Sequence, residues 1–147
     1  MKKLLTALFV TSVLFSCEGP EGPPGEPGME TQWKYVYYTV NQQDWEPVGN
    51  YNELGSFYRY GFDEPNLTDF IYTEGVVMGY AVINPGTREE ILRPLPDTWP
   101  MAEDTNTWTE SVTFDYMPGY VTFYVGYSDF ATGIRPPTMT FKLMMIW

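Results

Sequence analysis

The sequence contains no histidine, and it has a single cysteine, Cys17. Histidine is the commonest general base, a common metal ligand and the usual partner of a catalytic serine or cysteine. A single cysteine cannot form an internal disulfide. Paired carboxylates and a glycine-rich phosphate loop are also missing. These absences predict that the chain is not an enzyme and that it holds no cofactor and no metal.

Basic residues are scarce as well, with eight Lys and Arg against nineteen Asp and Glu and a net charge of −11. Lys2 and Lys3 fall within a predicted signal, so its removal takes the charge to −13. Nucleic-acid binding needs clustered basic residues, so nucleic acid is excluded as a partner. The same charge disfavours adhesion of the domain to anionic headgroups. We attribute the acidity to the solubility of an exported domain.

The N-terminus has the pattern of an export signal. Lys2 and Lys3 precede an apolar run of twelve residues from Leu4 to Phe15. As a helix this run would span about 18 Å, short of the roughly 30 Å of membrane hydrocarbon. Residues 1–16 are therefore predicted to be a lipoprotein signal peptide rather than a membrane-spanning helix.

Leu14-Phe15-Ser16-Cys17 resembles the lipobox of bacterial lipoproteins, with Leu at −3, a small residue at −1 and Cys at +1. Phe15 at −2 departs from the strictest form of that pattern. The resemblance implies lipid on the Cys17 sulfur and cleavage before it, and several acyl chains anchor a protein stably. We expect a lipid anchor in the bacterial envelope, at the outer membrane. Ordinary secretion with cleavage elsewhere is the alternative.

Glycine recurs at every third residue from Gly19 to Gly28, in a proline-rich stretch of collagen type. Three full triplets are too few for a stable triple helix, whereas the prolines favour polyproline II at about 3.1 Å per residue. We interpret residues 17–28 as a lipidated Cys plus a collagen-like tether. The tether would hold the domain, residues 29–147, roughly 30 Å from the membrane.

Residues 29–147 are long enough to bury a core without disulfides. Aromatic and β-branched runs predict strands, which we place at 33–40, 45–48, 56–62, 76–83, 87–93, 107–116, 120–127 and 138–147. Pro118-Gly119 predicts a type II turn between two of them. Asn66–Glu74 is predicted as one short helix, capped by Asn66 and stopped by Gly75. Residues 97–106 are predicted as a loop.

Seven or eight short strands predict an all-β fold, a two-sheet antiparallel β-sandwich of immunoglobulin-like architecture. A small barrel is the alternative. The run from 138 to 147 reaches the last residue, so we expect that end to be tied into a sheet.

The lipobox and glycine tract are followed by four further stretches: Leu67–Phe70 with Gly75–Val77, Leu92–Pro96, Gly119–Val125 and Pro137–Lys142. In this order they resemble uncharacterised lipoproteins of Gram-negative bacteria that carry a short collagen-like tract before a β domain. The resemblance covers nearly the whole chain. It implies an envelope location and brings no assigned activity with it.

An acidic cluster and several tryptophans are the candidate ligand sites. The oxygen-rich stretch Asp63–Asp69 could hold Ca²⁺, but it lacks EF-hand spacing, so we favour loop acidity and helix capping. Exposed aromatics can stack on sugars, although a small sandwich also fills its core with aromatics, and we favour the latter. Trp45, Trp99 and Trp108 lie in or beside predicted loops, which makes them the candidate glycan-stacking residues.

We therefore expect a small non-catalytic domain with a structural or protein-interaction role, and surface glycan binding is the alternative. The strand at 33–40 is apolar on both faces, so one face could pack the core and the other a neighbour. A loop over that second face in a monomer is the competing view. The short tract and the charge of −13 oppose association, so we expect a monomer, with a trimer as the alternative.

Overall fold

The computed structural model describes residues 30–147, of which Thr31–Trp147 form one compact unit. The predicted signal peptide, Cys17 and the glycine tract lie outside the described residues. The strands are β1 (Trp33–Val40), β2 (Glu46–Val48), β3 (Phe57–Asp63), β4 (Val76–Ile83), β5 (Ile91–Pro94), β6 (Asp97–Glu103), β7 (Asn106–Met117), β8 (Tyr120–Tyr127) and β9 (Met139–Ile146). The helical elements are the 3-10 turn η1 (Gln42–Asp44) and the helix α2 (Asp69–Glu74).

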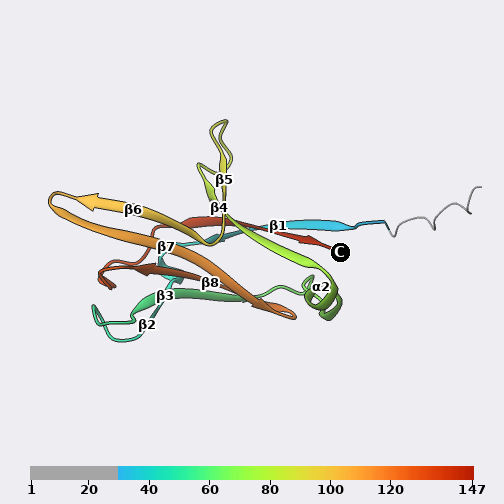
Figure 1. The fold of residues 1–147 in the computed structure, drawn as a ribbon, viewed down its shortest axis with the longest axis horizontal. Helices are drawn as coiled ribbons and strands as arrows, with labels where there is room; N and C mark the ends of the chain where they lie inside the picture. Colours follow the sequence, from blue (N-terminus) through green and yellow to red (C-terminus); the bar gives the residue numbers. More distant parts are fainter. Residues whose placement is uncertain (1–29) are drawn as a thin grey trace, which may run out of the picture. The chain divides into compact units, whose positions relative to one another are not determined.

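These nine strands form two open antiparallel sheets (Figure 1). Sheet A has the order β1-β9-β4-β5, and sheet B has the order β2-β3-β8-β7-β6. The prediction of an all-β antiparallel sandwich is confirmed, with nine strands rather than seven or eight. The last strand, β9, lies between β1 and β4, so the expectation that this end is tied into a sheet is also confirmed.

The core lies between the sheets, where alternate residues of the middle strands β8 and β9 meet. Six of their inward side chains are at most 1% exposed: Val121, Phe123, Val125, Phe141, Leu143 and Met145. Because strand side chains alternate between the two faces, the opposite set of each strand points outward. Burial of one such side chain contributes about 1.5–3 kcal/mol.

The β7–β8 hairpin has the predicted turn. Gly119 has a φ of +76°, which is the conformation that the third residue of a type II turn requires and that glycine adopts without strain. Met117 and Tyr120 pair across the turn. The hairpin prediction is confirmed.

Residues 97–106 do not form the predicted loop, because Asp97–Glu103 is a strand that pairs along the first half of β7. β7 is twelve residues long, and its backbone is available to β6 throughout that half. Pro100 lies within β6, which is an edge strand, where proline is tolerated. The sequence alone does not show that residues 97–103 form an edge strand, because that depends on pairing with β7.

Two other predicted elements are shorter in the structure. The strand expected at 87–93 is present only as Ile91–Pro94, because residues 84–90 turn back on themselves, with positive φ at Asn84 and Gly86. Helix α2 begins at Asp69 rather than near Asn66. Its cap is the Thr68 hydroxyl, which accepts a hydrogen bond from the Ile71 N–H at 3.2 Å.

Candidate functional site

The outward face of sheet A is lined by aromatic side chains at its β1 edge. Trp33, Tyr35 and Tyr37 point away from the core and are 63%, 48% and 47% exposed. The Trp33 and Tyr35 rings are stacked with centroids 5.8 Å apart. Tyr35 and Tyr37 meet edge to face at 6.0 Å. The three rings therefore form a ladder along the outermost strand of the sheet.

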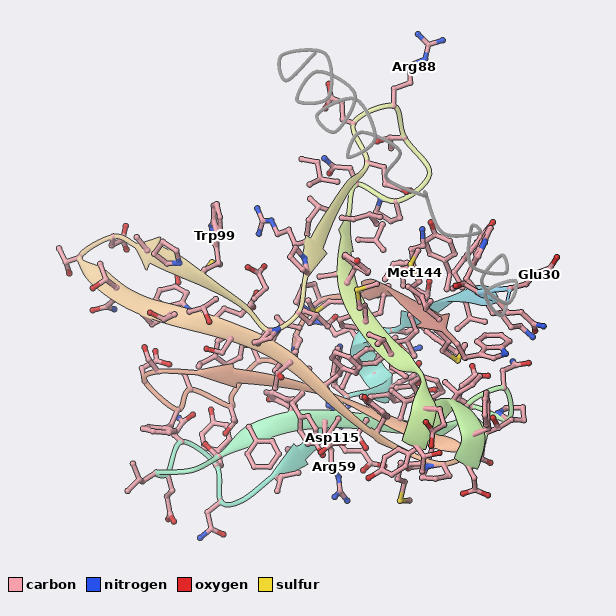
Figure 2. The ribbon with its side chains drawn as sticks, turned by 45° about the vertical axis from the view of Figure 1, so that its right-hand side comes forward. Glu30, Arg59, Arg88, Trp99, Asp115 and Met144 are labelled. Atoms are coloured by element: carbon pink, nitrogen blue, oxygen red, sulfur yellow. The ribbon has the colours of Figure 1, made fainter. Side chains whose placement is uncertain are left out.

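The strand register extends this ladder across β9 and β4. Three rows result: Trp33, Ile146 and Val76; Tyr35, Met144 and Met78; and Tyr37, Lys142 and Tyr80. We call these nine residues the aromatic sheet face. It contains no carboxylate, although the chain carries a net charge of −11. Figure 2 shows Met144 of this face on one side of the sandwich, with Arg59 and Asp115 of sheet B on the other.

Lys142 is the one charged residue of the aromatic sheet face. Its Nζ lies 4.8 Å from the centroid of the Tyr35 ring and 5.4 Å from that of Tyr37. Such cation–π contacts contribute about 0.5–1 kcal/mol at exposed sites. They hold the ammonium over β1, where a carboxylate of a bound molecule could reach it.

No described residue covers the β1 edge of this face. The exposure of Trp33, Tyr35 and Tyr37, together with 55% exposure of Val76, excludes a loop lying over it within residues 30–147. The competing view from the sequence, in which a loop covers the outer side of the first strand, is therefore wrong for the described part of the chain. One face of β1 packs against the core, and the other face is uncovered and available to another molecule.

Trp45 is the first of the three candidate glycan-stacking residues, and its predicted exposure is wrong. Its side chain is fully buried, and its indole N–H donates a hydrogen bond to the Pro137 carbonyl oxygen at 3.2 Å. Its ring meets Phe141 edge to face at 6.2 Å. Trp45 follows η1, where the chain crosses from sheet A to sheet B, and this crossing carries it between the sheets.

The other two candidates, Trp99 and Trp108, lie on the β6–β7 hairpin. Trp99 pairs with Glu110, and Trp108 pairs with Met101, so the two indoles share one face of the hairpin as diagonal neighbours. Trp99 is 49% exposed and Trp108 is half-buried. Figure 2 shows Trp99 projecting from β6. A shallow hollow of about 430 Å³ adjoins Met101 and Trp108.

Polar groups surround Trp99 on this hairpin. The Arg93 guanidinium lies 4.0 Å from the Trp99 ring centroid and pairs with Asp97 at 3.6 Å. Burial raises the pKa of the neighbouring Glu110 carboxyl; a hydrogen bond from Tyr127 opposes the rise, and the charge of Asp97 adds to it. An indole beside carboxylates and a guanidinium could stack on a sugar ring and bond its hydroxyls.

The acidic stretch considered for Ca²⁺ uses its oxygens within the fold. Glu64 is 1% exposed, and its Oε1 accepts hydrogen bonds from the Asn66 backbone N–H at 2.9 Å and side-chain amide at 2.6 Å. Asn66 in turn accepts one from Lys34. Among residues 30–147, no three His, Cys, Asp or Glu side chains form a group that could hold a metal ion. The same part of the chain has no helix long and apolar enough to cross a bilayer.

The sequence identified β1 as apolar on both faces but did not identify the rest of the aromatic sheet face. The pattern of β9 could have indicated the rest of this face. Its outward residues Met144 and Ile146 are apolar and alternate with the core residues Leu143 and Met145. A stretch that is apolar at every position, such as residues 143–146, has either a second protein layer over its outer side or an exposed apolar face.

Two surfaces thus have recognisable binding chemistry. The aromatic sheet face offers apolar contact area and one ammonium group to another protein, and the β6–β7 hairpin offers two indoles to a sugar. Comparisons with known proteins return nothing: no family model matches the chain, and no curated protein or solved structure matches it.

Proposed function

We propose that this protein is a non-catalytic lipoprotein of the cell envelope whose monomeric β domain binds a partner protein through the aromatic sheet face. The observation that carries the proposal is a face of nine residues without a carboxylate, in a chain of net charge −11. Its β1 edge and Val76 are exposed, and its other residues are half-buried. Contiguous exposed apolar patches on soluble domains are typical of interaction sites. Aromatic residues and Met are also enriched in protein interfaces.

The chemistry of the face indicates what the partner should offer. Trp33 and Tyr35 are large, exposed and already ordered by their mutual stacking, which suits them as anchors that enter apolar pockets. Lys142 calls for a carboxylate opposite it, because an unpaired ammonium buried in an interface is costly. The partner surface is therefore apolar with an acidic group.

The envelope location rests on the lipobox at Cys17 and on the glycine tract that follows it. A lipid anchor and a tether would keep the domain close to one membrane. They would also raise the local concentration of envelope partners around it, so that a modest affinity would suffice.

Site-specific photo-crosslinking in cells tests this function. A photoreactive amino acid is placed at Tyr35 or Met144 in the full-length chain, and at Thr113 as a matched control. Thr113 is exposed on sheet B, facing away from the core. We expect a discrete protein adduct from the first two positions only, and we expect Lys142→Glu to reduce its yield.

Adducts of equal yield from Thr113 would contradict the proposal, as would the absence of any adduct. Adducts to lipid alone from Tyr35 and Met144 would instead show that the face rests on the membrane surface.

A second candidate function, glycan capture, is favoured by the shared face of Trp99 and Trp108 on the β6–β7 hairpin. Stacking of aromatics on sugars needs exposed rings, and Trp99 meets that condition. The test is glycan-array binding by the wild type and by Trp99→Ala and Trp108→Ala, with Trp33→Ala as a control on the other sheet. Binding that survives both hairpin substitutions would remove this candidate. Trp45→Ala is uninformative here because Trp45 is buried.

A further inference from the structure

The edge strands of the two sheets differ in one respect. Sheet A ends in β1 and β5, and sheet B ends in β2 and β6. Three of these four strands contain a proline: Pro47 in β2, Pro94 in β5 and Pro100 in β6. Proline and shortness are two ways in which natural sheets prevent another strand from adding to an edge. β1 has eight residues and no proline, so it lacks this protection.

The backbone groups on the outer edge of β1 belong to its odd-numbered residues. Gln32 and Trp147 exchange both of their backbone hydrogen bonds, and the β1–β9 register continues from that pair. Since such pairs alternate along an antiparallel ladder, the even-numbered residues bond to β9. The N–H and C=O groups of Trp33, Tyr35, Tyr37 and Thr39 therefore point outward. Within the described residues, no other backbone group bonds to them.

We propose that β1 accepts an extended segment of the partner protein as a fifth strand of sheet A. This inference rests on the proposed function and specifies how the partner binds. An added strand would satisfy the outward backbone groups of β1, and alternate side chains would lie beside Trp33, Tyr35 and Tyr37. The aromatic sheet face and the free edge of β1 then form one binding surface.

The charge around β1 indicates that the added partner segment is both acidic and apolar. Lys142 lies over β1 on the aromatic sheet face, and β1 contains no acidic residue. Lys34 of β1 lies on the opposite face of the strand, where it donates a hydrogen bond to Asn66. A segment with alternating apolar residues and one or two carboxylates matches this local charge. Carboxylates on its outward side would face the Lys142 ammonium, which already lies over the Tyr35 and Tyr37 rings.

A second copy of this chain suits the edge less well. Tyr38 of β1 packs on Phe62 of β3, with ring centroids 4.1 Å apart, so β1 lies over β3. In sheet B, β2 continues beyond β3 on the side of the free edge. A second copy that paired through its own β1 would bring its β3 and β2 into the space that β2 of the first copy occupies. A single added segment would not. The net charge of −11 on each chain also opposes self-association.

A substitution at Tyr37 separates backbone pairing from side-chain contact. Tyr37→Pro removes the outward N–H without removing a hydrogen bond to β9, and proline is tolerated on an outer edge. Tyr37→Thr removes the same ring but keeps the N–H, and it is the matched control. Equal melting temperatures of the two variants would show that both remain folded, and Thr39→Pro, at another outward position, is the substitute if Tyr37→Pro melts early.

The probe is a phage library of random twelve-residue peptides, selected on residues 18–147, which retain every described residue. We expect enriched peptides with alternating apolar residues and carboxylates. Tyr37→Thr should weaken binding of the enriched peptide a few-fold, and Tyr37→Pro should weaken it more than about tenfold, or about 1.4 kcal/mol.

Three results would overturn the inference. The first is a selection that enriches no peptide. The second is equal weakening by Tyr37→Thr and Tyr37→Pro, which would leave side-chain docking and hence the proposed function intact. The third is a doubled mass in light scattering without peptide that Tyr37→Pro returns to the monomer value, which would assign the edge to a second copy. Loss of the cellular crosslinks from Tyr35 and Met144, by contrast, would remove the proposed function itself.

Discussion

Phe123 and Phe141 stack across the interface of the two sheets, with ring centroids 3.9 Å apart and planes inclined by 14°. Phe123 lies on β8 and Phe141 on β9, and neither ring is exposed. Both strands have neighbours on either side within their sheets. This contact therefore lies at the centre of the core and holds the two sheets together.

Phe123→Ala should lower the free energy of unfolding by about 3–5 kcal/mol, because it deletes a buried ring and leaves a cavity between rigid strands. Urea unfolding followed by tryptophan fluorescence measures the change. Thr122→Ala, next to it on β8 but on the opposite face, is the control and should change stability little. A loss below about 1 kcal/mol for Phe123→Ala would mean that the sheets do not pack as described.

Trp45 and Trp99 should respond in opposite ways to substitution by alanine. Trp45→Ala should cost about 3–5 kcal/mol, because the ring is fully buried and the Pro137 carbonyl oxygen would lose its hydrogen-bond donor. Trp99→Ala should cost about 1 kcal/mol or less, because its ring is half exposed and loses chiefly the contact with Arg93. Thermal unfolding of both variants checks the ranking, and equal costs would contradict it.

Glu110 should make stability depend on pH. Burial raises the pKa of its carboxyl above the ordinary value, so the folded state binds a proton more readily than the unfolded state does. The stabilising effect is fully present below about pH 4, the ordinary range for glutamate, and it is lost as the pH rises through the raised pKa. The free energy of unfolding of Glu110→Gln, measured in urea, should therefore rise relative to that of the wild type as the pH increases above about 4.

Glu103→Gln, which changes an exposed carboxylate on the same hairpin, is the control for this measurement. A difference between wild type and Glu110→Gln that stays constant with pH would show that Glu110 does not titrate differently in the folded and unfolded states.

The sequence predicted best those strands whose alternation of apolar residues and flanking turns are enough to define them. β8 alternates apolar residues from Val121 to Val125 after a Pro118-Gly119 turn, and both signals are local. β6 was missed because Pro100 lowers its intrinsic strand preference, and its partner β7 supplies the pairing that stabilises it. Edge strands depend on a neighbour, which a single-sequence pattern does not reveal.

The candidate site was predictable only in part for a related reason. The second apolar face of β1 was visible in the order of its residues, but whether another layer covers that face depends on where the connections run. Trp45 was misplaced for the same reason, since its burial follows from the path of the chain between the sheets. A sequence pattern predicts which residues lie on the same face of a strand, whereas the exposure of that face depends on the whole fold.

Cys17→Ala should release the protein from the membrane fraction. If Cys17 carries the lipid, its sulfur is the point of attachment, and several acyl chains are needed for a stable anchor. Fractionation of cells that produce the wild type and the variant, followed by immunoblotting, measures the distribution. Ser16→Ala, which keeps a small residue before the cysteine, should leave it unchanged. A Cys17→Ala protein that stays with the outer membrane would contradict the lipidation proposal.

Gly79 of β4 lies against the ring of Phe114 from β7, and a Cβ at Gly79 would come within 2.6 Å of the Phe114 Cε1 atom. Gly79→Ala should therefore lower the free energy of unfolding by about 1–3 kcal/mol, because the ring must move within a packed core. Phe114→Leu in the same chain frees space beside the new methyl group. The double variant should be less destabilised than the two single changes added together, by about 0.5 kcal/mol or more.

Gly126→Ala is the matched control, since the nearest atom to its Cβ would be the Phe57 Cβ at 4.0 Å. It should change stability little, or increase it by lowering the entropy of the unfolded chain. A double-mutant cycle from urea unfolding gives the coupling between positions 79 and 114. Strict additivity, or an equal loss from Gly126→Ala, would show that the cost at Gly79 comes from the backbone of β4 and not from contact with the Phe114 ring.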